Sequence, residues 1–321
     1  MRICFLSDAG SEHTKKWCNW FHKHGHEIFV VSLTYGEIEN VDVRVVETGA
    51  NARGPELGKL RYFMAVPQIR KIVDEISPDI LNAHYATSYG TIAALIGYKN
   101  YVLSIWGSDI YEFPKKSILH KLLLEFSLHK AGYIFSTSNA MAQEAKKYTS
   151  KTIEITPFGV DMELFCPNKR ISKRNRIDGN FIVGTVKTLV PKYGIDYLIK
   201  AVAIIKRNYK DIPIRLRIAG KGEYESKYKT LAEECGISDI TEWLGFISQQ
   251  DAAKEWANMD VAVVASTEDS ESFGVSAVEA EACGTPVIIS DIPGLMEATS
   301  PNFSSMVVPR KNEDGFLIRI L

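Results

Sequence analysis

The sequence predicts an α/β protein built from two doubly wound parallel sheets in tandem. Short apolar runs alternate with longer helix-periodic segments, as buried parallel strands alternate with crossover helices. The alternation is interrupted once, by a basic, apolar-poor stretch at 166–180, and then restarts. A length of 321 residues also suits two domains better than one.

The first half begins with one βαβ unit. A strand at Ile3–Leu6 precedes a helix at Lys15–His24, which Gly25 ends, and a second strand follows at Ile28–Ser32. Further strands are predicted at Val43–Glu47, Ile80–Ala83, Val102–Ile105, Tyr133–Ser136 and Ile153–Ile155. Further helices are predicted at Leu60–Ile76, Ile118–Lys130 and Ala140–Tyr148.

The second half repeats the pattern. Its predicted strands are Phe181–Thr185, Arg215–Ala219, Thr241–Leu244, Val261–Ala265, Val287–Ser290 and Ser304–Val308. Its predicted helices are Asp196–Asn208, Tyr224–Cys235, Gln249–Ala257 and Ser276–Ala282. Pro157 and Gly159 break the pattern between the halves, so we place the domain boundary near Phe165, with domains at 1–165 and 166–321. Ligands of such folds bind outside the carboxyl ends of the strands, so the loops facing a cleft between the sheets are where chemistry is expected.

Composition excludes several classes of partner and compartment. Lys plus Arg is 38 and Asp plus Glu is 39, so the chain lacks the net positive charge that favours binding to nucleic acid. The first residues form a strand rather than a signal peptide, and no apolar run is long enough to span a bilayer. The five cysteines have no metal-ligand spacing, and we expect them to be buried reduced thiols of a cytoplasmic protein. Peripheral contact with the inner face of a membrane stays open, and nothing indicates the oligomeric state.

The most informative stretch is 268–287, which joins a strand to a helix. Glu271 lies in the loop and Glu279 lies inside the helix, so both carboxylates can accept hydrogen bonds from the hydroxyls of one ligand. The backbone N–H groups near Phe273, Gly274 and Val275 would form a helix amino terminus that favours an anion such as a diphosphate. Because Gly274 has no side chain, it would allow a phosphate group to approach the backbone closely.

A purely structural interpretation of these acids competes with the functional one. Glu268 and Glu271 would then be acids favoured by the helix dipole, and Glu279 would belong to a solvated face. The position decides in favour of function, because a helix stop and a buried strand follow at 283–287 and place the acids at a strand end.

The same stretch resembles the signature of glycosyltransferase family 4. The resemblance rests on two Glu separated by seven residues, with Phe-Gly between them and Ala-Cys-Gly-Thr-Pro-Val after them. Lys187 and Lys192 match the two cations that hold the donor diphosphate in the family. Gly220 and Gly222 resemble its loop beside the nucleotide, and Phe246 its base-contacting turn. Each of these is weak alone, but their order supports the family.

The resemblance implies a GT-B fold, with two Rossmann-like domains, and transfer of a hexosyl-type sugar with retention of configuration. The donor would be a UDP- or GDP-sugar, and the acceptor a glycan or lipid-linked molecule of surface polysaccharide or glycoconjugate synthesis. It implies that Glu271 holds the hydroxyls of the transferred sugar, Glu279 the ribose, and Lys187 and Lys192 the departing diphosphate. No metal and no separate cofactor are expected.

The first half is expected to bind the acceptor. Gly10 and His13 lie in the loop after the first strand, where contact with a ligand and simple helix capping are equally good interpretations. His84 ends a strand and is a candidate catalytic residue, although a structural histidine is at least as good an interpretation. Asp109 is a further catalytic candidate. Trp106 stands where many relatives have a His, and it offers a stacking surface instead of a titratable group.

Two alternatives to a transferase remain open from the sequence. A nucleotide-sugar 2-epimerase would use the same fold, and a non-catalytic sugar-nucleotide or glycan-binding protein would arise from a degraded transferase. Relatives continue beyond residue 321 with helices, and 315–321 does not continue the helix expected from Pro309, so a truncation with reduced stability or activity is a hypothesis. A nicotinamide dehydrogenase is disfavoured because the first βα turn lacks a GxGxxG motif.

Overall fold

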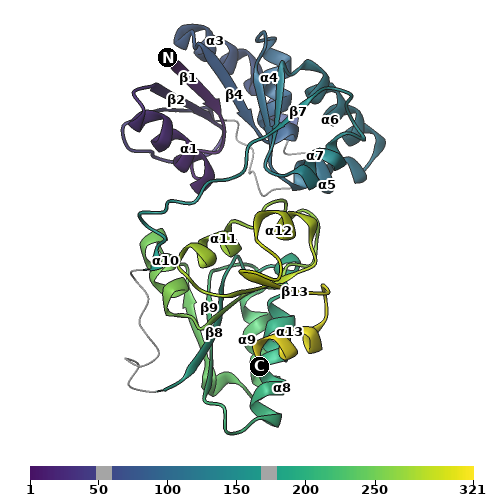
Figure 1. Cartoon of the computed structure of the whole chain (residues 1–321). Helices are drawn as coiled ribbons and strands as arrows, with labels where there is room; N and C mark the ends of the chain where they lie inside the picture. Colours follow the sequence, from purple (N-terminus) through teal and green to yellow (C-terminus); the bar gives the residue numbers. More distant parts are fainter. Residues whose placement is uncertain (48–59, 168–178) are drawn as a thin grey trace. The chain divides into compact units, whose positions relative to one another are not determined.

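The computed structural model describes residues 1–47, 60–167 and 179–321. The chain divides into two compact units, Met1–Pro157 and Phe158–Leu321 (Figure 1). Within these ranges each unit has one sheet, with seven strands in the first and six in the second, and every strand pair in both sheets is parallel. The predicted fold class is confirmed.

The sheet of the first unit has the order β3-β2-β1-β4-β5-β6-β7. Its strands are β1 (Arg2–Leu6), β2 (Glu27–Ser32), β3 (Asp42–Val45), β4 (Ile80–His84), β5 (Val102–Ile105), β6 (Tyr133–Ser136) and β7 (Ile153–Ile155). Its α-helices are α1 (Glu12–Lys23), α3 (Val66–Ile76), α4 (Gly90–Ile96), α5 (Ser108–Tyr111), α6 (Ile118–Lys130) and α7 (Asn139–Ala145). Shorter turns are the 3-10 helices η1 (Leu60–Ala65) and η3 (Phe113–Lys115) and the π-helix η2 (Tyr85–Tyr89).

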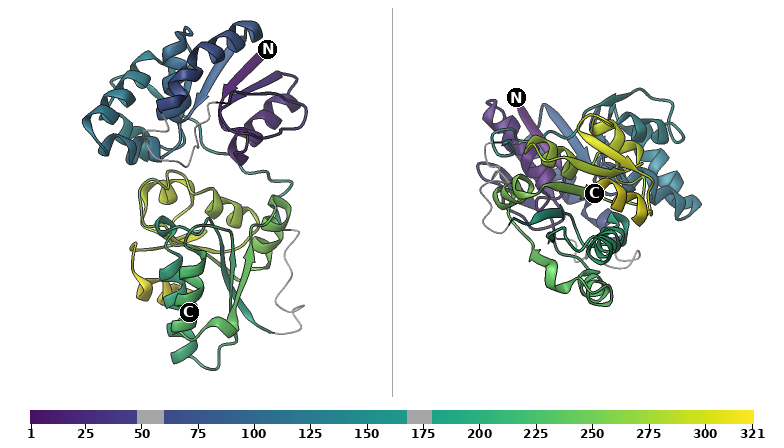
Figure 2. Two further views of the ribbon diagram at one scale, coloured as in Figure 1. Left: turned by 180° about the vertical axis from the view of Figure 1, so that it is seen from behind. Right: turned by 60° about the horizontal axis from the view of Figure 1, so that its bottom comes forward.

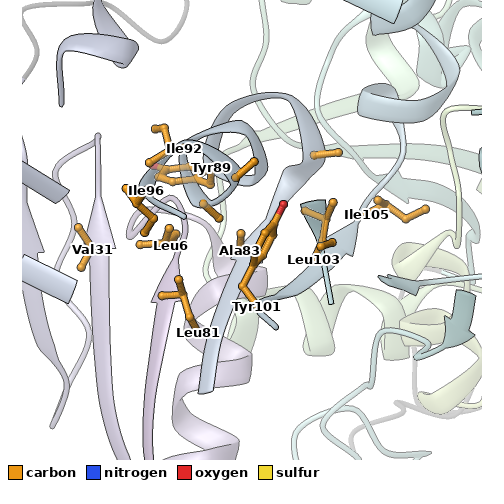
Figure 3. Packing of buried hydrophobic residues seen from close by; sticks show 14 of the residues in the cluster. Leu6, Val31, Leu81, Ala83, Tyr89, Ile92, Ile96, Tyr101, Leu103 and Ile105 are labelled. Carbon is orange, nitrogen blue, oxygen red and sulfur yellow. The ribbon is translucent and has the colours of Figure 1, made fainter. Parts of the chain in front are cut away.

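Strand β1 shows how this sheet is covered on both faces. Successive side chains of a strand point to opposite faces. Cys4 and Leu6 pack into the core that contains residues of α3, α4 and α6, whereas Ile3 and Phe5 pack with Cys18 of α1. Figure 3 shows the first of these cores, where residues of β1, β2, β4 and β5 meet those of α4. A strand apolar on both faces is therefore sandwiched between helices.

The sheet of the second unit has the order β10-β9-β8-β11-β12-β13. Its strands are β8 (Phe181–Val186), β9 (Ile214–Ala219), β10 (Thr241–Gly245), β11 (Val261–Val264), β12 (Val287–Ser290) and β13 (Ser305–Val308). Its α-helices are α8 (Ile195–Asn208), α9 (Glu225–Glu234), α10 (Gln249–Asn258), α11 (Val275–Ala282), α12 (Pro293–Ala298) and α13 (Glu313–Ile320). The described part of the unit also contains the 3-10 turns η6 (Pro191–Tyr193) and η7 (Ser238–Ile240).

This sheet also carries helices on both faces, as Figure 2 shows from behind. Buried residues of α8, α9 and α13 form one core, and those of α10, α11 and α12 form the other. Val263 of β11 belongs to the first core, and its neighbours Ala262 and Val264 belong to the second. The continuous apolar run of β11 is what this double coverage requires.

Most predicted elements are present, and the differences have local causes. The third strand is Asp42–Val45 rather than Val43–Glu47. Helices α4, α5 and α12 were not predicted, because α5 and α12 are short and α4 follows a π-helical turn that disrupts the 3.6-residue period. The units divide eight residues before the boundary placed near Phe165, which is fully buried in a core of the second unit.

The expectation for residues 315–321 is wrong. Glu313–Ile320 is a helix whose amino terminus is capped by the Asn312 side chain, which accepts a hydrogen bond from the Gly315 N–H at 2.9 Å. Phe316 and Ile320 are buried in the core that also contains α8. The four-residue spacing of these two side chains places them on one face of the helix.

Two further expectations concern cysteines and membrane spans. All five cysteines are free thiols. Cys4, Cys18 and Cys283 are buried as predicted, whereas Cys166 and Cys235 are half-buried. Burial raises the pKa of both Cys4 and Cys18 to about 12. Within the described ranges, none of the helices has the length and apolar character needed to cross a bilayer.

Candidate functional site

In the second unit, loops from three neighbouring strand ends bond to one another. The N–H of Lys187, after β8, donates to the carbonyl of Ala219 at 2.9 Å, and the N–H of Leu189 donates to that of Lys221 at 3.1 Å. The N–H of Thr267, after β11, donates to the carbonyl of Lys192 at 2.7 Å. The loops that carry Lys187 and Lys192 are thus fixed to the loops after β9 and β11.

The centre of this loop cluster is a buried ion pair. Lys187 Nζ lies 2.7 Å from Glu271 Oε2, and only 10% and 11% of the two side chains are exposed. Ser266 donates a second hydrogen bond to the same carboxylate oxygen at 3.2 Å. The structure therefore brings together a lysine predicted to bind diphosphate and a glutamate predicted to bind sugar, which lie 84 positions apart in the sequence.

The two lysines of this loop also share an aromatic side chain. Lys187 Nζ lies 4.4 Å from the centre of the Tyr193 ring, and Lys192 Nζ lies 5.1 Å from it. Burial by itself would lower the pKa of Lys187, but Glu271 and Tyr193 raise it overall. Burial would raise the pKa of Glu271, but Lys187 lowers it overall. Both partners of the pair are therefore charged at neutral pH.

Glu279 and the start of α11 lie in the same unit. Glu279 is 6% exposed, and its Oε2 accepts a hydrogen bond from Trp256 Nε1 at 3.4 Å. This excludes the interpretation of Glu279 as part of a solvated face.

Gly274 precedes the helix α11 with φ of 77°, and a Cβ there would come within 2.2 Å of Leu295 Cδ2. Phe273 is buried, and its ring packs edge-on against that of Phe158.

Two further candidate residues are glycines for steric reasons. A Cβ at Gly220, where φ is 136°, would lie 1.9 Å from the carbonyl oxygen of Lys187, and one at Gly222 would lie 2.2 Å from that of Leu189. These glycines let the loops after β8 and β9 approach each other. Phe246, which follows β10, is 73% exposed.

The first unit contains a separate pocket of about 850 Å³ at the carboxyl ends of its strands. Its lining combines polar residues such as Ser7, Asp8 and His84 with apolar ones such as Trp106 and Leu123. The volume lies in the range of pockets that enclose small-molecule ligands. Of the apolar part of this pocket only Trp106 was predicted, because the other residues come from several separate segments.

His84 is part of the inner surface of this pocket. It is 1% exposed, and its Nδ1 lies 2.9 Å from Ser7 Oγ, whereas its Nε2 has no hydrogen-bond partner among the described residues. The rings of Phe5 and Trp106 pack against the imidazole, with centroids 5.1 and 4.7 Å away. Burial, assisted by His13, lowers the pKa of His84 to about 3, so the imidazole is neutral at neutral pH.

The neutral state of His84 predicts a pH-dependent stability. Its folded pKa is depressed, so the unfolded state binds more protons below about pH 6.5, and stability falls as the pH drops from there towards 3. The loss from this residue between pH 7 and pH 5 should be about 2 kcal/mol. Urea unfolding of His84→Phe should show this part of the pH dependence removed, whereas the exposed His22→Gln should behave as wild type. An unchanged pH dependence in His84→Phe would contradict the assignment.

Asp109 has a structural role that the sequence did not reveal. It is fully buried, and its carboxylate accepts hydrogen bonds from the backbone N–H groups of Ala86 at 2.9 Å, Gly107 at 2.8 Å and Trp106 at 3.2 Å. Burial raises the pKa of this carboxyl group, although the backbone donors act in the opposite direction. Asp109 joins the loop after β5 to the start of η2 and does not line the pocket. We therefore regard it as a positioning residue.

The loop after β1 is fixed by its own side chains. The N–H of Gly10 donates to Asp8 Oδ1 at 2.8 Å, and Asp8 and Ser11, but not Gly10, line the pocket. His13 packs edge-on against Trp106 with centroids 5.6 Å apart. Among the described residues, no three His, Cys, Asp or Glu side chains gather as metal ligands would.

Comparison with known families accounts for both units. Residues 2–138 match the model described as glycosyl transferase 4-like, and residues 167–320 match that of glycosyl transferases group 1. The chain belongs to glycosyltransferase family 4. An uncharacterised glycosyltransferase of Methanocaldococcus jannaschii is 27% identical over 94% of this chain and 82% of its own length. A D-inositol 3-phosphate glycosyltransferase of Pseudarthrobacter chlorophenolicus is 33% identical over 76% of this chain, which spans 62% of that relative.

Solved structures confirm the GT-B fold of this glycosyltransferase. Sucrose-phosphate synthase from Thermosynechococcus elongatus has a TM-score of 0.82 at 18% identity, over all of this chain and 88% of its own. HepE from Anabaena, solved in complex with UDP, has a TM-score of 0.79 at 20% identity, over all of this chain and 89% of its own. At these identities the likeness concerns the fold alone.

Proposed function

We propose that this family 4 glycosyltransferase moves a hexosyl-type sugar from a UDP- or GDP-sugar to a glycan or lipid-linked acceptor, with retention of anomeric configuration. The observation that carries the donor part is the buried Lys187–Glu271 pair among the loops at the strand ends of the second unit. Burying two charges is costly in free energy, and replacing them by apolar residues is often neutral or stabilising. A functional requirement for both charges explains why such a pair is present.

Each charged group of the loop cluster has a proposed role. Lys187 and Lys192 would neutralise the leaving diphosphate, together with the amino terminus of α11. An ammonium carries three N–H donors, so Lys187 can bind a phosphate oxygen while it still bonds to Glu271. Glu271 would orient the hydroxyls of the transferred sugar, and Glu279 would accept hydrogen bonds from the ribose. The retaining mechanism follows the family resemblance.

The relatives support UDP as the first nucleotide to test. HepE was solved with UDP, with UDP and glucose, and with UDP-glucose, and each of these structures has the fold of this chain at 20% identity. The base would contact the turn that holds Phe246, and Gly220 and Gly222 would allow the loops beside the diphosphate to approach each other. A polyol phosphate is one acceptor to test, because D-inositol 3-phosphate glycosyltransferases are among the relatives.

Calorimetric titration with UDP, GDP and ADP tests the donor site. Glu279→Gln keeps an acceptor for Trp256 but removes the charge, so we expect it to weaken binding of the preferred nucleotide by about tenfold or more, the value of a hydrogen bond to a charged group. Glu281→Gln makes the same change in the same helix, where Glu281 bonds to Ser304, and should leave affinity nearly unchanged. Folded wild-type protein that binds none of the three nucleotides would contradict the proposal.

Product analysis then separates transfer from epimerisation. The donor sugar should be released or transferred with its C2 configuration intact, and the rate should rise when an acceptor is added. Conversion of the nucleotide sugar into its 2-epimer without an acceptor would instead identify an epimerase. Nucleotide binding without any turnover would identify a binding protein.

A further inference from the structure

The pocket of the first unit has fully buried polar side chains and a largely exposed leucine in its lining, together with the buried Ile92 and the exposed Glu112 and Lys116. Ser7 and His84, which line it, are both 1% exposed. Leu119, which also lines it, is 73% exposed. Protein surfaces ordinarily bury apolar groups and expose polar ones. Buried polar groups and an exposed leucine in the lining of one pocket suit a ligand with a polar head and an apolar remainder.

The polar side chains of the lining suit a hydroxyl-bearing head without negative charge. His84 presents a neutral imidazole whose Nε2 has no partner among the described residues. Asp8 is a carboxylate that accepts hydrogen bonds from the Gly10 N–H and the Thr34 hydroxyl. A second carboxylate or a phosphate here would be repelled by Asp8, whereas sugar hydroxyls would both donate to it and bond to His84.

The apolar residues of the lining form what we call the apolar wall. They are Ile92 of α4, Trp106 after β5, Phe113 of η3, and Leu119 and Leu123 of α6. Leu119 and Leu123 are four residues apart, so they lie on one face of the helix. An alkyl or prenyl chain would find apolar contacts on this wall, beside Glu112, Lys116 and His120, which also line the pocket.

The start of α6 carries exposed apolar side chains both in the pocket lining and beside it. Ile118, Leu119 and Leu122 are 66%, 73% and 52% exposed. Lys115 and Lys116 precede them and are exposed, and Lys116 lines the pocket together with the acid Glu112. An exposed apolar cluster beside lysines is what a chain leaving the pocket towards a lipid surface would meet.

We propose that this pocket binds a glycolipid-type acceptor, with its sugar hydroxyls at Ser7 and His84 and its apolar chain along the wall to the first turn of α6. The inference rests on the proposed function and names the acceptor class that the transferase would use. It selects the lipid-linked acceptor over a wholly polar glycan, because a polar glycan would leave the apolar wall uncovered by ligand.

A matched pair of ligands tests the proposal. Octyl glucoside, kept below its micelle concentration, and methyl glucoside share one head and differ only in the chain. Each buried methylene strengthens binding by on the order of fourfold, so octyl glucoside should bind saturably, at one site, at least about tenfold more tightly than methyl glucoside. Equal affinities for the two, or no saturable binding of octyl glucoside, would overturn the proposal.

A matched pair of variants then locates the chain. Leu119→Glu places a charge on the pocket wall, and Ile118→Glu places the same charge on the same helical turn outside the residues that line the pocket. Both side chains are more than half exposed, so neither change threatens folding. Leu119→Glu should remove most of the preference for octyl glucoside, by about tenfold, and Ile118→Glu should retain it. Equal losses in the two variants would also overturn the proposal.

The test is independent of the donor site. It measures binding of a neutral amphiphile to the first unit, whereas the nucleotide titration measures the second unit. Loss of nucleotide binding with the octyl glucoside preference intact would reject the proposed function and leave the amphiphile site. Nucleotide binding without that preference would reject only the acceptor class, and transfer to a soluble polyol phosphate would then identify a polar acceptor.

Discussion

Lys187→Met is expected to lower the free energy of unfolding by about 3 to 5 kcal/mol, because it leaves the buried Glu271 carboxylate without its counter-charge. Donor binding should be lost as well. The pKa of Glu271, which Lys187 now holds low, would rise in the variant. A folded pKa above the unfolded value makes stability fall as the pH rises, so the destabilisation should be smaller at pH 5 than at pH 8.

Two further variants separate the ion pair from ordinary packing. Lys229→Met removes a lysine that also lies 2.7 Å from its partner, Glu225, but on the surface, and it should cost less than about 1 kcal/mol. The double variant Lys187→Met with Glu271→Leu should recover most of the lost stability without recovering nucleotide binding. A small effect of Lys187→Met, equal to that of Lys229→Met, would show that the pair is not buried in solution.

Gly194→Ala is the second change with a large expected effect. Gly194 has φ of 62°, and a Cβ there would come within 2.0 Å of the Ala265 carbonyl oxygen. Backbone must therefore move, and Gly194 lies between Lys192 and the start of α8. We expect a loss of about 3 to 4 kcal/mol, from left-handed strain and overpacking together, with weaker nucleotide binding.

Gly236→Ala is the matched control for this steric effect. Gly236 has nearly the same φ, 68°, but a Cβ there would meet no atom within 4 Å. Because only backbone strain acts there, Gly236→Ala should lower the free energy of unfolding by about 1 kcal/mol. Denaturant unfolding of both variants measures the difference. If the two variants were equally stable, the close approach of the loops after β8 and β11 would not exist in solution.

The sequence predicted the central strands well because strands such as β11 and β12 are buried on both faces, whereas the edge strands β3, β7 and β10 are only partly buried. Val102–Ile105, Tyr133–Ser136 and Val287–Ser290 have the predicted bounds, since short, mostly apolar runs are typical of strands in a parallel sheet. Segment 85–96 was missed. Its π-helical turn begins at Tyr85 with φ of 76°, and Asp109, more than 20 positions away, fixes that turn.

Within the candidate donor site, the sequence supplied the residues and not their pairing. Lys187 and Glu271 were predicted as separate ligand contacts, whereas the structure shows them bonded to each other. The bond between Glu279 and Trp256 joins α11 to α10 and excludes a solvated carboxylate. No local pattern specifies such contacts, because they depend on how strand ends far apart in the chain converge.

The sequence by itself determined the alternation of strands and helices, the two-sheet architecture and the family, because each depends on local periodicity and on motif order. Tertiary structure alone decided that Asp109 positions backbone, that His84 is buried and neutral, and that polar and apolar residues from separate segments form one pocket. Burial and long-range contact set the charge and accessibility of a side chain, and neither is a property of its neighbours in the sequence.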